Sequence, residues 1–458
     1  MSKPPVTKNQ KLTLTISDLT YQGMGVGKVD HYPLFIEDAL PDEVVDITVI
    51  KVSKNYGFAK VINRHNDSPL RTEGIDKTYT QTGIAPLQHL KYDAQLSFKR
   101  NQVMELLKKS HLEEVEVAPV LGMDEPIHYR NKAQVPVRMV KNRLETGFFK
   151  KNSHNFVPME DYLIQDERID EVIKAVRDIL RKFMISAYDE KTHKGVVRHI
   201  IVRRGHYSHE VMVVLVTRAK KIPESDVVVD EILKACPDVR TVVQNINQEK
   251  TNVILGKTEK ILAGDGRITD SLNGINFEIS AHSFYQVNSI QTEKIYQKVV
   301  EASELTGKET VIDAYCGIGT ISLNLAQKAA KVYGVEIVPE AIDDAKKNAT
   351  VNNIDNATFE VGTASDWMAK WSEDGIKPDV VVFDPPRKGL ESEVINSTAK
   401  LSPAKIVYVS CNPATLVRDI QLFTEKGYQV AKPIQPVDQF PMTTHIESIT
   451  VLTRAENN

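Results

Sequence analysis

The sequence predicts an α/β protein in three parts: a small N-terminal β-barrel, a central mixed α/β domain and a C-terminal doubly wound parallel sheet. Three observations carry this prediction. Short alternating segments crowd the N-terminal end, helical and strand-like patterns mix in the middle, and strand–helix alternation fills the last third. A chain of 458 residues is also too long for one hydrophobic core. We place the three parts at 1–67, 68–279 and 280–458.

The N-terminal part has the pattern of short, half-buried strands. In residues 8–66, apolar and polar residues alternate over segments such as LTLTISDLT. About five short strands in so little chain favour closure into a barrel, because closure removes exposed strand edges. From this pattern alone, a barrel without activity and an oligonucleotide-binding barrel are both possible.

The middle of the chain combines helices and strands and carries unevenly distributed charge. Helical spacing of apolar residues predicts helices over 91–109 and 167–184. Residues 128–151 hold seven Lys or Arg against one acid, and residues 191–221 hold eight against one. Since the net charge of the chain is −3, these clusters indicate a phosphate-binding surface, although solvated strand faces would give the same pattern.

The last third is typical of a doubly wound sheet, whose ligands bind at the carboxyl ends of the strands. The first strand ends at Asp313, before Gly317 and Gly319. The second strand ends in Glu336, and the fourth ends in Asp384. Each residue alone could belong to a helix cap or a turn, but together they predict a cofactor pocket.

The glycine pattern distinguishes two classes of cofactor. A dinucleotide fingerprint has a third small residue, and Ser322 fits that position only in part. S-adenosylmethionine has no pyrophosphate, so a shorter glycine set is sufficient for it. The sequence therefore favours a methyltransferase over a nicotinamide enzyme.

Three cysteines occur, and no two are spaced as a metal-binding pair. Cys411 follows the fifth strand, beside the strand that ends in Asp384, so its thiol is a candidate nucleophile. The alternative for Cys411 is a buried apolar cysteine. Cys316 lies inside the glycine loop and is interpreted as structural, and Cys236 has no evident partner.

Covalent catalysis by Cys411 also requires a base that removes a proton later in the cycle. The C-terminal segment FPMTTHIE supplies the carboxylate of Glu447 at the start of the last strand. His445 is the alternative, since its ordinary pKa suits proton transfer. We predict that Glu447 is the base.

Five segments resemble the signatures of the RNA uracil-5-methyltransferases, and the resemblance covers nearly the whole chain. They are SFYQVN (283–288), DAYCGIGTISL (313–323), DPPRKGL (384–390), SCNPATLVRD (410–419) and FPMTTHIE (440–447). The resemblance implies a Rossmann-like methyltransferase domain in which four residues contact S-adenosylmethionine: Gln286, Tyr315, Glu336 and Asp384. It also implies that Cys411 is the nucleophile and Glu447 the base.

The same resemblance implies a reaction and a substrate. S-adenosylmethionine would methylate C5 of specific uridines in 23S rRNA, through a covalent bond between Cys411 and C6 of the base. The N-terminal part resembles an RNA-binding TRAM domain, an OB-like barrel, with Gly23, Gly25, Gly27 and Lys28 in its glycine-rich turn. That barrel favours rRNA, and tRNA is the alternative substrate. A cytosine-5 methyltransferase and an RNA-binding assembly factor without activity are the rival hypotheses.

Many rRNA members of this family hold a four-iron cluster with four cysteines. Here Asp76, Thr82, Ala85 and Tyr162 stand where those cysteines would fall. Because such a cluster needs thiolate ligands, the sequence predicts no metal, as in the Gram-positive members that lack it.

Cellular location and partners follow in part from composition. The few cysteines and an N-terminus without an apolar segment predict a soluble, cytoplasmic protein that contacts no membrane. RNA is the expected partner, and DNA is not. The sequence determines neither the oligomeric state nor which uridine is modified.

Overall fold

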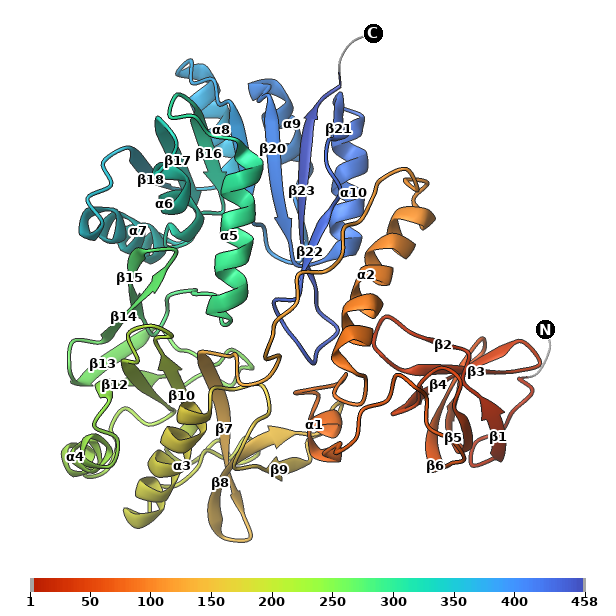
Figure 1. The fold of residues 1–458 in the computed structure, drawn as a ribbon. Helices are drawn as coiled ribbons and strands as arrows, with labels where there is room; N and C mark the ends of the chain where they lie inside the picture. Colours follow the sequence, from red (N-terminus) through yellow and green to blue (C-terminus); the bar gives the residue numbers. More distant parts are fainter. Residues whose placement is uncertain (1–3, 456–458) are drawn as a thin grey trace.

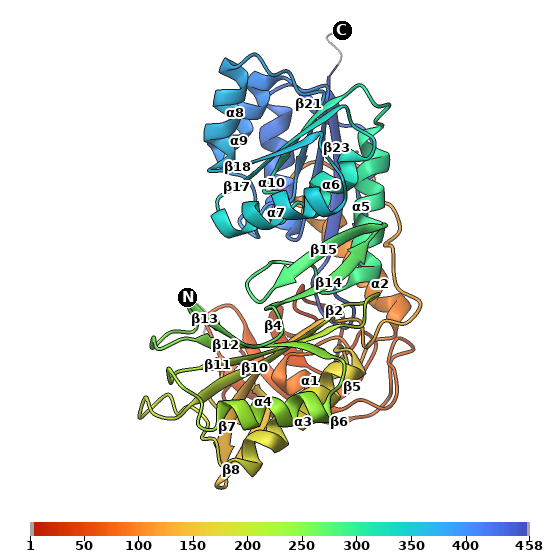
Figure 2. The same ribbon diagram turned by 90° about the vertical axis from the view of Figure 1, so that its left-hand side faces the viewer.

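Three bodies follow one another in the computed structural model, which describes residues 4–455 (Figure 1). A six-stranded sheet forms the N-terminal body, a seven-stranded sheet the central body and an eight-stranded sheet the C-terminal body. A two-stranded ribbon, β14 (Arg267–Leu272) and β15 (Ile275–Ser280), lies between the central and C-terminal bodies (Figure 2). Among residues 4–455, no helix has both the length and the apolar character needed to cross a membrane.

The N-terminal sheet curls around a small apolar core. Its strands, in the order β1-β5-β6-β4-β3-β2, are β1 (Lys11–Thr15), β2 (Asp18–Leu19), β3 (Gly25–Val29), β4 (Tyr32–Glu37), β5 (Val44–Val52) and β6 (Gly57–Arg64). Burial alternates along β4, where Leu34 and Ile36 are fully buried while Phe35 is only half-buried. A Cβ atom at Gly25 would lie 2.7 Å from the carbonyl oxygen of Ala39, which explains the glycine there.

The central sheet is covered on both faces. Its strands, in the order β13-β12-β11-β10-β7-β8-β9, are β7 (Lys132–Val140), β8 (Arg143–Phe149), β9 (Phe156–Pro158), β10 (Val197–Arg204), β11 (Val211–Thr217), β12 (Val239–Ile246) and β13 (Thr258–Ala263). Helices α3 (Glu167–Lys182) and α4 (Ser225–Ala235) pack on one face. The helix α3 begins as predicted, because the Asp166 carboxylate accepts a hydrogen bond from the N–H of Arg168 at 2.9 Å.

The other face of the central sheet packs against the ribbon. Met212 and Val214 of β11 share one apolar core with Ile268 of β14 and Phe277 of β15. Val311 of the C-terminal sheet belongs to the same core. The central and C-terminal bodies are therefore joined by continuous apolar packing rather than by a flexible linker.

Two arginines of the basic segment 191–221 are engaged inside the protein. Arg203 is 3% exposed, and its guanidinium donates hydrogen bonds to the carbonyl oxygens of Ser280 and Ser283. Arg198 is also buried and donates to carbonyl oxygens in the loop 247–251. The predicted phosphate-binding surface is therefore wrong for these arginines, because buried loop carbonyls already satisfy their donors.

The helix α2 (Tyr92–Lys109) connects distant parts of the chain. It follows the short helix α1 (Lys77–Thr82) within the predicted central part. However, Val103 and Leu107 of α2 pack in the same core as Ile312 of the C-terminal sheet. Figure 1 shows α2 beside the C-terminal strands. The helix α2, which belongs to the predicted part 68–279, therefore packs on the C-terminal body. The domain boundaries at 67 and 279 stay predictions.

The C-terminal sheet has the order β18-β17-β16-β19-β20-β23-β21, with β22 paired to β23. Its strands are β16 (Thr310–Ala314), β17 (Lys331–Glu336), β18 (Ala357–Val361), β19 (Val380–Phe383), β20 (Lys405–Ser410), β21 (Tyr428–Val430), β22 (Gln435–Val437) and β23 (Glu447–Arg454). Its helices are α5 (Ser289–Ser303), α6 (Thr320–Ala326), α7 (Pro339–Val351), α8 (Ala364–Glu373), α9 (Ser392–Leu401) and α10 (Pro413–Thr424). Strands β16 to β20 pair in parallel, and β23 runs antiparallel to β20.

The positions that would hold iron ligands are occupied by capping and packing residues. The Asp76 carboxylate caps α1 by accepting a hydrogen bond from the N–H of Thr78 at 2.7 Å. Ala85 is fully buried, and the buried Tyr162 ring lies 5.4 Å from the Phe148 ring in edge contact. Within residues 4–455, no three His, Cys, Asp or Glu side chains gather as around a metal ion. That the protein binds no cluster stays a prediction.

Glu43 fastens the barrel to the segment that leaves it. Its fully buried carboxylate accepts hydrogen bonds from the backbone N–H groups of Leu40 and Ser68 and from the guanidinium groups of Arg64 and Arg71. Burial by itself raises the pKa of Glu43, but Arg71 and the backbone donors lower that pKa further, so the net shift is downward.

We expect Glu43 to make the stability of the protein depend on pH. Since its folded pKa lies below the ordinary 4.5, its contribution is present above that value and is lost as the pH falls through the folded pKa. Glu43→Gln should lower the free energy of unfolding at pH 7 by about 3 kcal/mol, and the deficit should shrink in acid. Urea unfolding followed by circular dichroism measures both. The exposed Glu37→Gln is the control, and an equal deficit at both pH values would contradict an ionic role.

Candidate functional site

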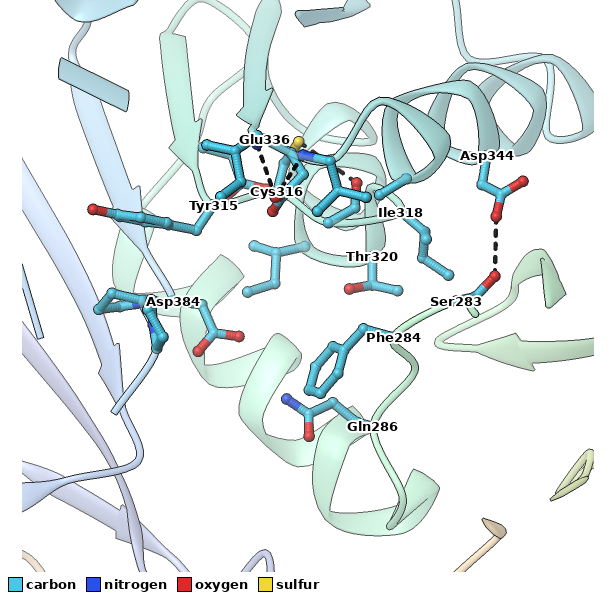
Figure 3. A pocket seen from close by; sticks show the side chains of 18 of the residues that line it. Ser283, Phe284, Gln286, Tyr315, Cys316, Ile318, Thr320, Glu336, Asp344 and Asp384 are labelled. Atoms are coloured by element: carbon cyan, nitrogen blue, oxygen red, sulfur yellow. Dashed lines mark hydrogen bonds between the residues drawn. The ribbon is translucent and has the colours of Figure 1, made fainter. Parts of the chain in front are cut away.

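The carboxyl ends of β16, β17, β19 and β20 open onto one cavity of about 1390 Å³. This is the edge at which parallel α/β sheets bind their ligands. All six residues implied by the sequence line the cavity: Gln286, Tyr315, Glu336, Asp384, Cys411 and Glu447. Figure 3 shows four of them, together with Phe284, arranged around the same space.

A tight turn after β16 forms one wall. Tyr315 has a φ of +72°, a left-handed conformation that is unusual for a bulky side chain, and Gly319 follows with a φ of +83°. The N–H groups of Tyr315 and Cys316 both donate to the carbonyl oxygen of Val335 at 3.0 Å, which ties the turn to β17. Cys316 is 4% exposed, and burial raises the pKa of its thiol, in agreement with a structural role.

Glu336 ends β17 with its carboxylate held in place. Its Oε1 accepts hydrogen bonds from the N–H groups of Ile337 at 2.8 Å and Val338 at 3.1 Å. Oε2 takes no part in these bonds and can accept hydrogen bonds from a ligand's hydroxyl groups. Beside it, the Ile337 side chain is 64% exposed and lines the cavity, where it offers an apolar surface to a flat ring.

Two further carboxyl groups line the cavity. Burial raises the pKa of both Asp313 and Asp384 to about 7. The Ser322 hydroxyl donates to Oδ2 of Asp313 at 2.5 Å. Oδ1 of Asp313 is buried and has no hydrogen-bond partner among the described residues. A buried polar atom without a partner indicates a position where a bound ligand supplies the missing donor.

Cys411 and Glu447 stand opposite each other at the ends of β20 and β23. These strands are antiparallel with Ser410 opposite Ser448, so Cys411 and Glu447 are the facing residues one position outward. Glu447 is 5% exposed, and its Oε2 has no partner among residues 4–455. Burial raises the pKa of Glu447 well above its ordinary value, and the Asp384 carboxylate adds to this shift.

The Cys411 thiol has a raised pKa. Burial raises it to about 11, the carboxylates of Glu447 and Asp384 contribute, and Arg387 opposes them. Nucleophilic cysteines commonly have a lowered pKa, so the surroundings of Cys411 differ from that expectation. The main cause is the burial of the thiol, and the neighbouring carboxylates further disfavour a negative charge there.

His445 lies beside the Arg387 guanidinium, whose Nη2 is 3.2 Å from both ring nitrogens. Desolvation by the cavity wall, with the charges of Arg387 and Lys99, lowers the pKa of His445 to about 4. The imidazole is therefore neutral and weakly basic at pH 7. Glu447, whose pKa is raised, is the stronger base of the two once it is ionised.

The loop that carries these residues is anchored by a buried ion pair. Lys99 of α2 and Asp438, which follows β22, are both fully buried, and Lys99 Nζ lies 2.5 Å from Asp438 Oδ1. Lys99 also donates to the carbonyl oxygen of Phe440 at 3.0 Å, and the Tyr92 hydroxyl donates to Asp438 Oδ2 at 3.0 Å. From α5, Gln291 donates to the carbonyl oxygen of Asp438.

Comparison with known proteins agrees with this arrangement. A family model described as tRNA (uracil-5-)-methyltransferase matches residues 91–455, and a TRAM domain model matches residues 5–62. The chain belongs to the tRNA (uracil-5-)-methyltransferase family. A protein of Lactiplantibacillus plantarum described as an uncharacterized RNA methyltransferase is 58% identical over 452 residues, covering 99% of both chains. A protein of Enterococcus faecalis with the same description is 54% identical over 456 residues, covering 99% of this chain and 100% of its own.

A solved structure extends the comparison. The Pyrococcus abyssi tRNA (uracil-54, C5)-methyltransferase in complex with S-adenosyl-L-homocysteine is similar with a TM-score of 0.77 and 26% identity, covering 96% of this chain and 100% of that one. The predicted fold class is thereby confirmed, with a TRAM domain at the N-terminus and a methyltransferase fold at the C-terminus.

Family membership makes S-adenosylmethionine the methyl donor of this RNA methyltransferase, and the cavity fits that molecule. The Glu336 carboxylate suits ribose hydroxyl groups, and the exposed Ile337 suits an adenine face. The unpartnered Oδ1 of Asp313 suits an ammonium group. The carboxyl groups of Asp384 and Glu447 surround a position where a sulfonium cation is electrostatically favoured.

Sequence reasoning did not single out several residues of the site. Phe284 is 69% exposed and projects into the cavity (Figure 3), and Arg387 lines it beside His445. Both lie within the sequence motifs that resemble the family's signatures, and their place in those motifs could have identified them. The pair of Lys99 and Asp438 had no such signal, because the two residues are far apart in sequence.

We expect Lys99→Met to destabilise the enzyme by about 3–5 kcal/mol, because it leaves the buried Asp438 carboxylate unpaired. Methyl transfer should also fall, since the loop before Glu447 loses its anchor. Combining Lys99→Met with Asp438→Leu should recover much of the stability. Urea unfolding and transfer of labelled methyl groups are the measurements. Lys108→Met on the same helix is the control, and equal losses in both variants would contradict the anchoring role.

Alkylation of Cys411 by iodoacetamide should accelerate steadily as the pH rises from 7 to 10, because its thiol pKa is about 11. Glu447→Gln removes a nearby carboxylate and should shift this pH dependence to lower pH. Mass spectrometry of the Cys411 peptide gives the rate, with Cys411→Ser as the baseline. A dependence that levels off near pH 8, or that Glu447→Gln leaves in place, would contradict the electrostatic account.

Proposed function

We propose that this enzyme methylates C5 of specific uridines in 23S rRNA and that Cys411 is the nucleophile. The observation that carries the proposal is the facing pair of Cys411 and Glu447 at one end of the cavity. C5 of uracil is a poor nucleophile until a group adds to C6. A thiol that can add to C6 and a base that can take the proton from C5 are the two groups that such a reaction requires.

The steps assign one role to each side chain. The Cys411 thiol gives up its proton to water, its sulfur bonds to C6 of the uracil, and the C5–C6 double bond becomes an enolate centred on C5. Bound S-adenosylmethionine would supply an electrophilic methyl group on its sulfonium; C5 takes up this methyl group as the methyl–sulfur bond breaks, and the electron pair stays on the sulfur of the departing S-adenosylhomocysteine. Glu447 then removes the proton from C5, and the electron pair re-forms the C5–C6 double bond as the Cys411 thiolate leaves.

We assign Glu447 rather than His445 as the base. Oε2 of Glu447 is buried without a partner among the described residues and lies on the Cys411 side of the cavity. Its raised pKa makes the ionised carboxylate more basic than an exposed one. His445 has a pKa lowered to about 4 and is correspondingly weak.

Four residues are assigned to the cofactor. Glu336 binds the ribose hydroxyl groups through its free oxygen, and Tyr315 shapes the turn that faces the methionine portion. Asp384 lines the same cavity as Cys411 and would face the methyl-bearing part of the cofactor. Gln286 faces the same space. Its backbone carbonyl oxygen accepts a hydrogen bond from the Asn131 side-chain amide at 2.9 Å, which holds the chain around Gln286 in place.

Phe284 is assigned to the target base. Its ring is 69% exposed and lines the cavity. An exposed aromatic ring in the same cavity as the proposed nucleophile suits stacking against a uracil that has been flipped out of its strand. The barrel and the segment 68–279 then hold the surrounding RNA.

The identity of the RNA has two candidates. The TRAM domain and the resemblance to iron-free rRNA members support 23S rRNA. The similar Pyrococcus abyssi structure is named for tRNA uracil-54 and aligns with 96% of this chain, which favours tRNA as the second candidate. Mapping 5-methyluridine in rRNA and tRNA from cells that lack the protein decides between them: loss from 23S rRNA alone supports the first.

RNA that contains 5-fluorouracil should trap a covalent complex with the enzyme, because fluorine at C5 cannot leave as a proton does. The complex should appear on denaturing gels with the wild-type protein and be absent with Cys411→Ala. With ordinary RNA, Glu447→Gln should accumulate the methylated adduct and lose turnover by about 100-fold or more. Methylation by Cys411→Ala at the wild-type rate would exclude the mechanism.

A further inference from the structure

Three aromatic rings meet on the outer face of the N-terminal barrel. The Phe35 ring centroid lies 5.6 Å from that of Tyr56 and 5.8 Å from that of Phe58, and the Tyr56 and Phe58 centroids are 5.7 Å apart. Phe35 pairs with Phe58 across β4 and β6, and Tyr56 lies in the turn that enters β6. The three residues form what we call the aromatic platform.

The aromatic platform is not part of the barrel core. The core consists of the residues between those of the platform, such as Leu34, Ile36 and Ala59, whose side chains point inward. Tyr56 is 40% exposed, and Phe35 and Phe58 are half-buried. What covers these two rings is their contact with each other and with their neighbours on the outer face. Three adjacent rings on the outside of a small barrel are costly to leave in water and indicate a binding surface.

Lysines surround the aromatic platform. Lys51 stands opposite Phe58 across β5 and β6, with its Nζ 5.9 Å from the ring centroid. Lys60 is exposed two residues beyond Phe58 on the same face, and Lys54 is exposed in the adjoining turn. Among residues 4–455, none of the three takes part in an ion pair, and Glu37, which stands opposite Lys60 across β4 and β6, forms none with it.

We propose that the aromatic platform binds a single-stranded segment of the RNA by stacking bases on its rings, with the lysines contacting phosphates. Aromatic rings interleaved with unpaired cations on a barrel face are the combination that single strands require. Double-stranded RNA does not fit, because its bases are stacked inside the helix. A purely apolar protein partner would not account for the three lysines. That the bound RNA is the substrate of methylation rests on the function proposed above. The binding of single strands by the platform does not depend on that function.

The barrel is in direct contact with the catalytic loop. A Cβ atom at Gly23, in the glycine-rich turn, would lie 2.5 Å from Leu87 and 3.7 Å from Thr444, which precedes His445. The Leu87 N–H also donates to the carbonyl oxygen of Met442 at 3.0 Å. RNA held by the platform is therefore anchored to a body that is packed against the loop leading to Glu447.

Tyr56→Ala and Phe58→Ala, each in the full chain, should raise the Kd for a fluorescein-labelled oligouridylate of about twenty nucleotides by about tenfold, since one stacked base is released. Phe58→Trp should retain binding. Lys51→Gln combined with Lys60→Gln should reduce the slope of log Kd against log salt by about 0.7 for each phosphate that the protein no longer neutralises. Fluorescence anisotropy measures each value.

Tyr21→Ala is the matched control, because Tyr21 is 71% exposed on the same barrel but lies outside the platform. It should leave the Kd unchanged. Changes of less than twofold for both Tyr56→Ala and Phe58→Ala would overturn the proposal, as would equal losses with Tyr21→Ala. Equal weakening for a blunt double-stranded RNA would overturn the assignment to single strands.

Cys411→Ala separates this proposal from the proposed function. That variant should lose 5-methyluridine formation while its Kd for oligouridylate stays at the wild-type value. If the wild-type protein forms no 5-methyluridine but Tyr56→Ala still weakens binding, the proposed function fails and the platform stands. If methylation proceeds and the platform variants bind normally, the platform proposal fails alone.

Discussion

A buried ion pair between Lys99 and Asp438 holds together the parts of the chain that meet at the cavity. Lys99 belongs to α2, which leaves the barrel, and Asp438 begins the loop that leads to Glu447. Both charges are removed from water, so neither is tolerated without the other. Because Tyr92 and Gln291 bind the same aspartate, the loop, α2 and α5 are held in one arrangement. The positions of His445 and Glu447 depend on that arrangement.

The cavity that results is crowded with carboxyl groups. Burial raises the pKa values of Asp313, Asp384 and Glu447, and neighbouring carboxylates add to the shift at Asp313 and Glu447. Burial is also the main cause of the raised pKa of Cys411, to which Glu447 and Asp384 contribute. Such a site is electrostatically suited to a cationic ligand, since a positive charge there relieves the repulsion. The electrostatics of the cavity and the charge of a sulfonium methyl donor are therefore complementary.

Charge counted along the sequence did not show which basic side chains a ligand can reach. The basic segments of the central part resembled a phosphate-binding face, but Arg198 and Arg203 lie inside and bind loop carbonyls. The barrel, whose composition is unremarkable, instead presents aromatic rings beside unpaired lysines. A sequence shows which residues are charged, whereas burial and pairing decide which charges a ligand can reach.

The sequence by itself predicted the strand-rich N-terminal part, the alternating strands and helices of the last third and the motifs at the strand ends, because periodicity and turn chemistry are local. It placed Glu336 and Asp384 at one edge of the sheet, since parallel strands share that edge. Only the tertiary structure decided that the reversed β23 sets Glu447 opposite Cys411. It alone also joined Lys99 to Asp438 and raised the pKa of the thiol, because these depend on contacts between residues distant in sequence and on the water excluded around them.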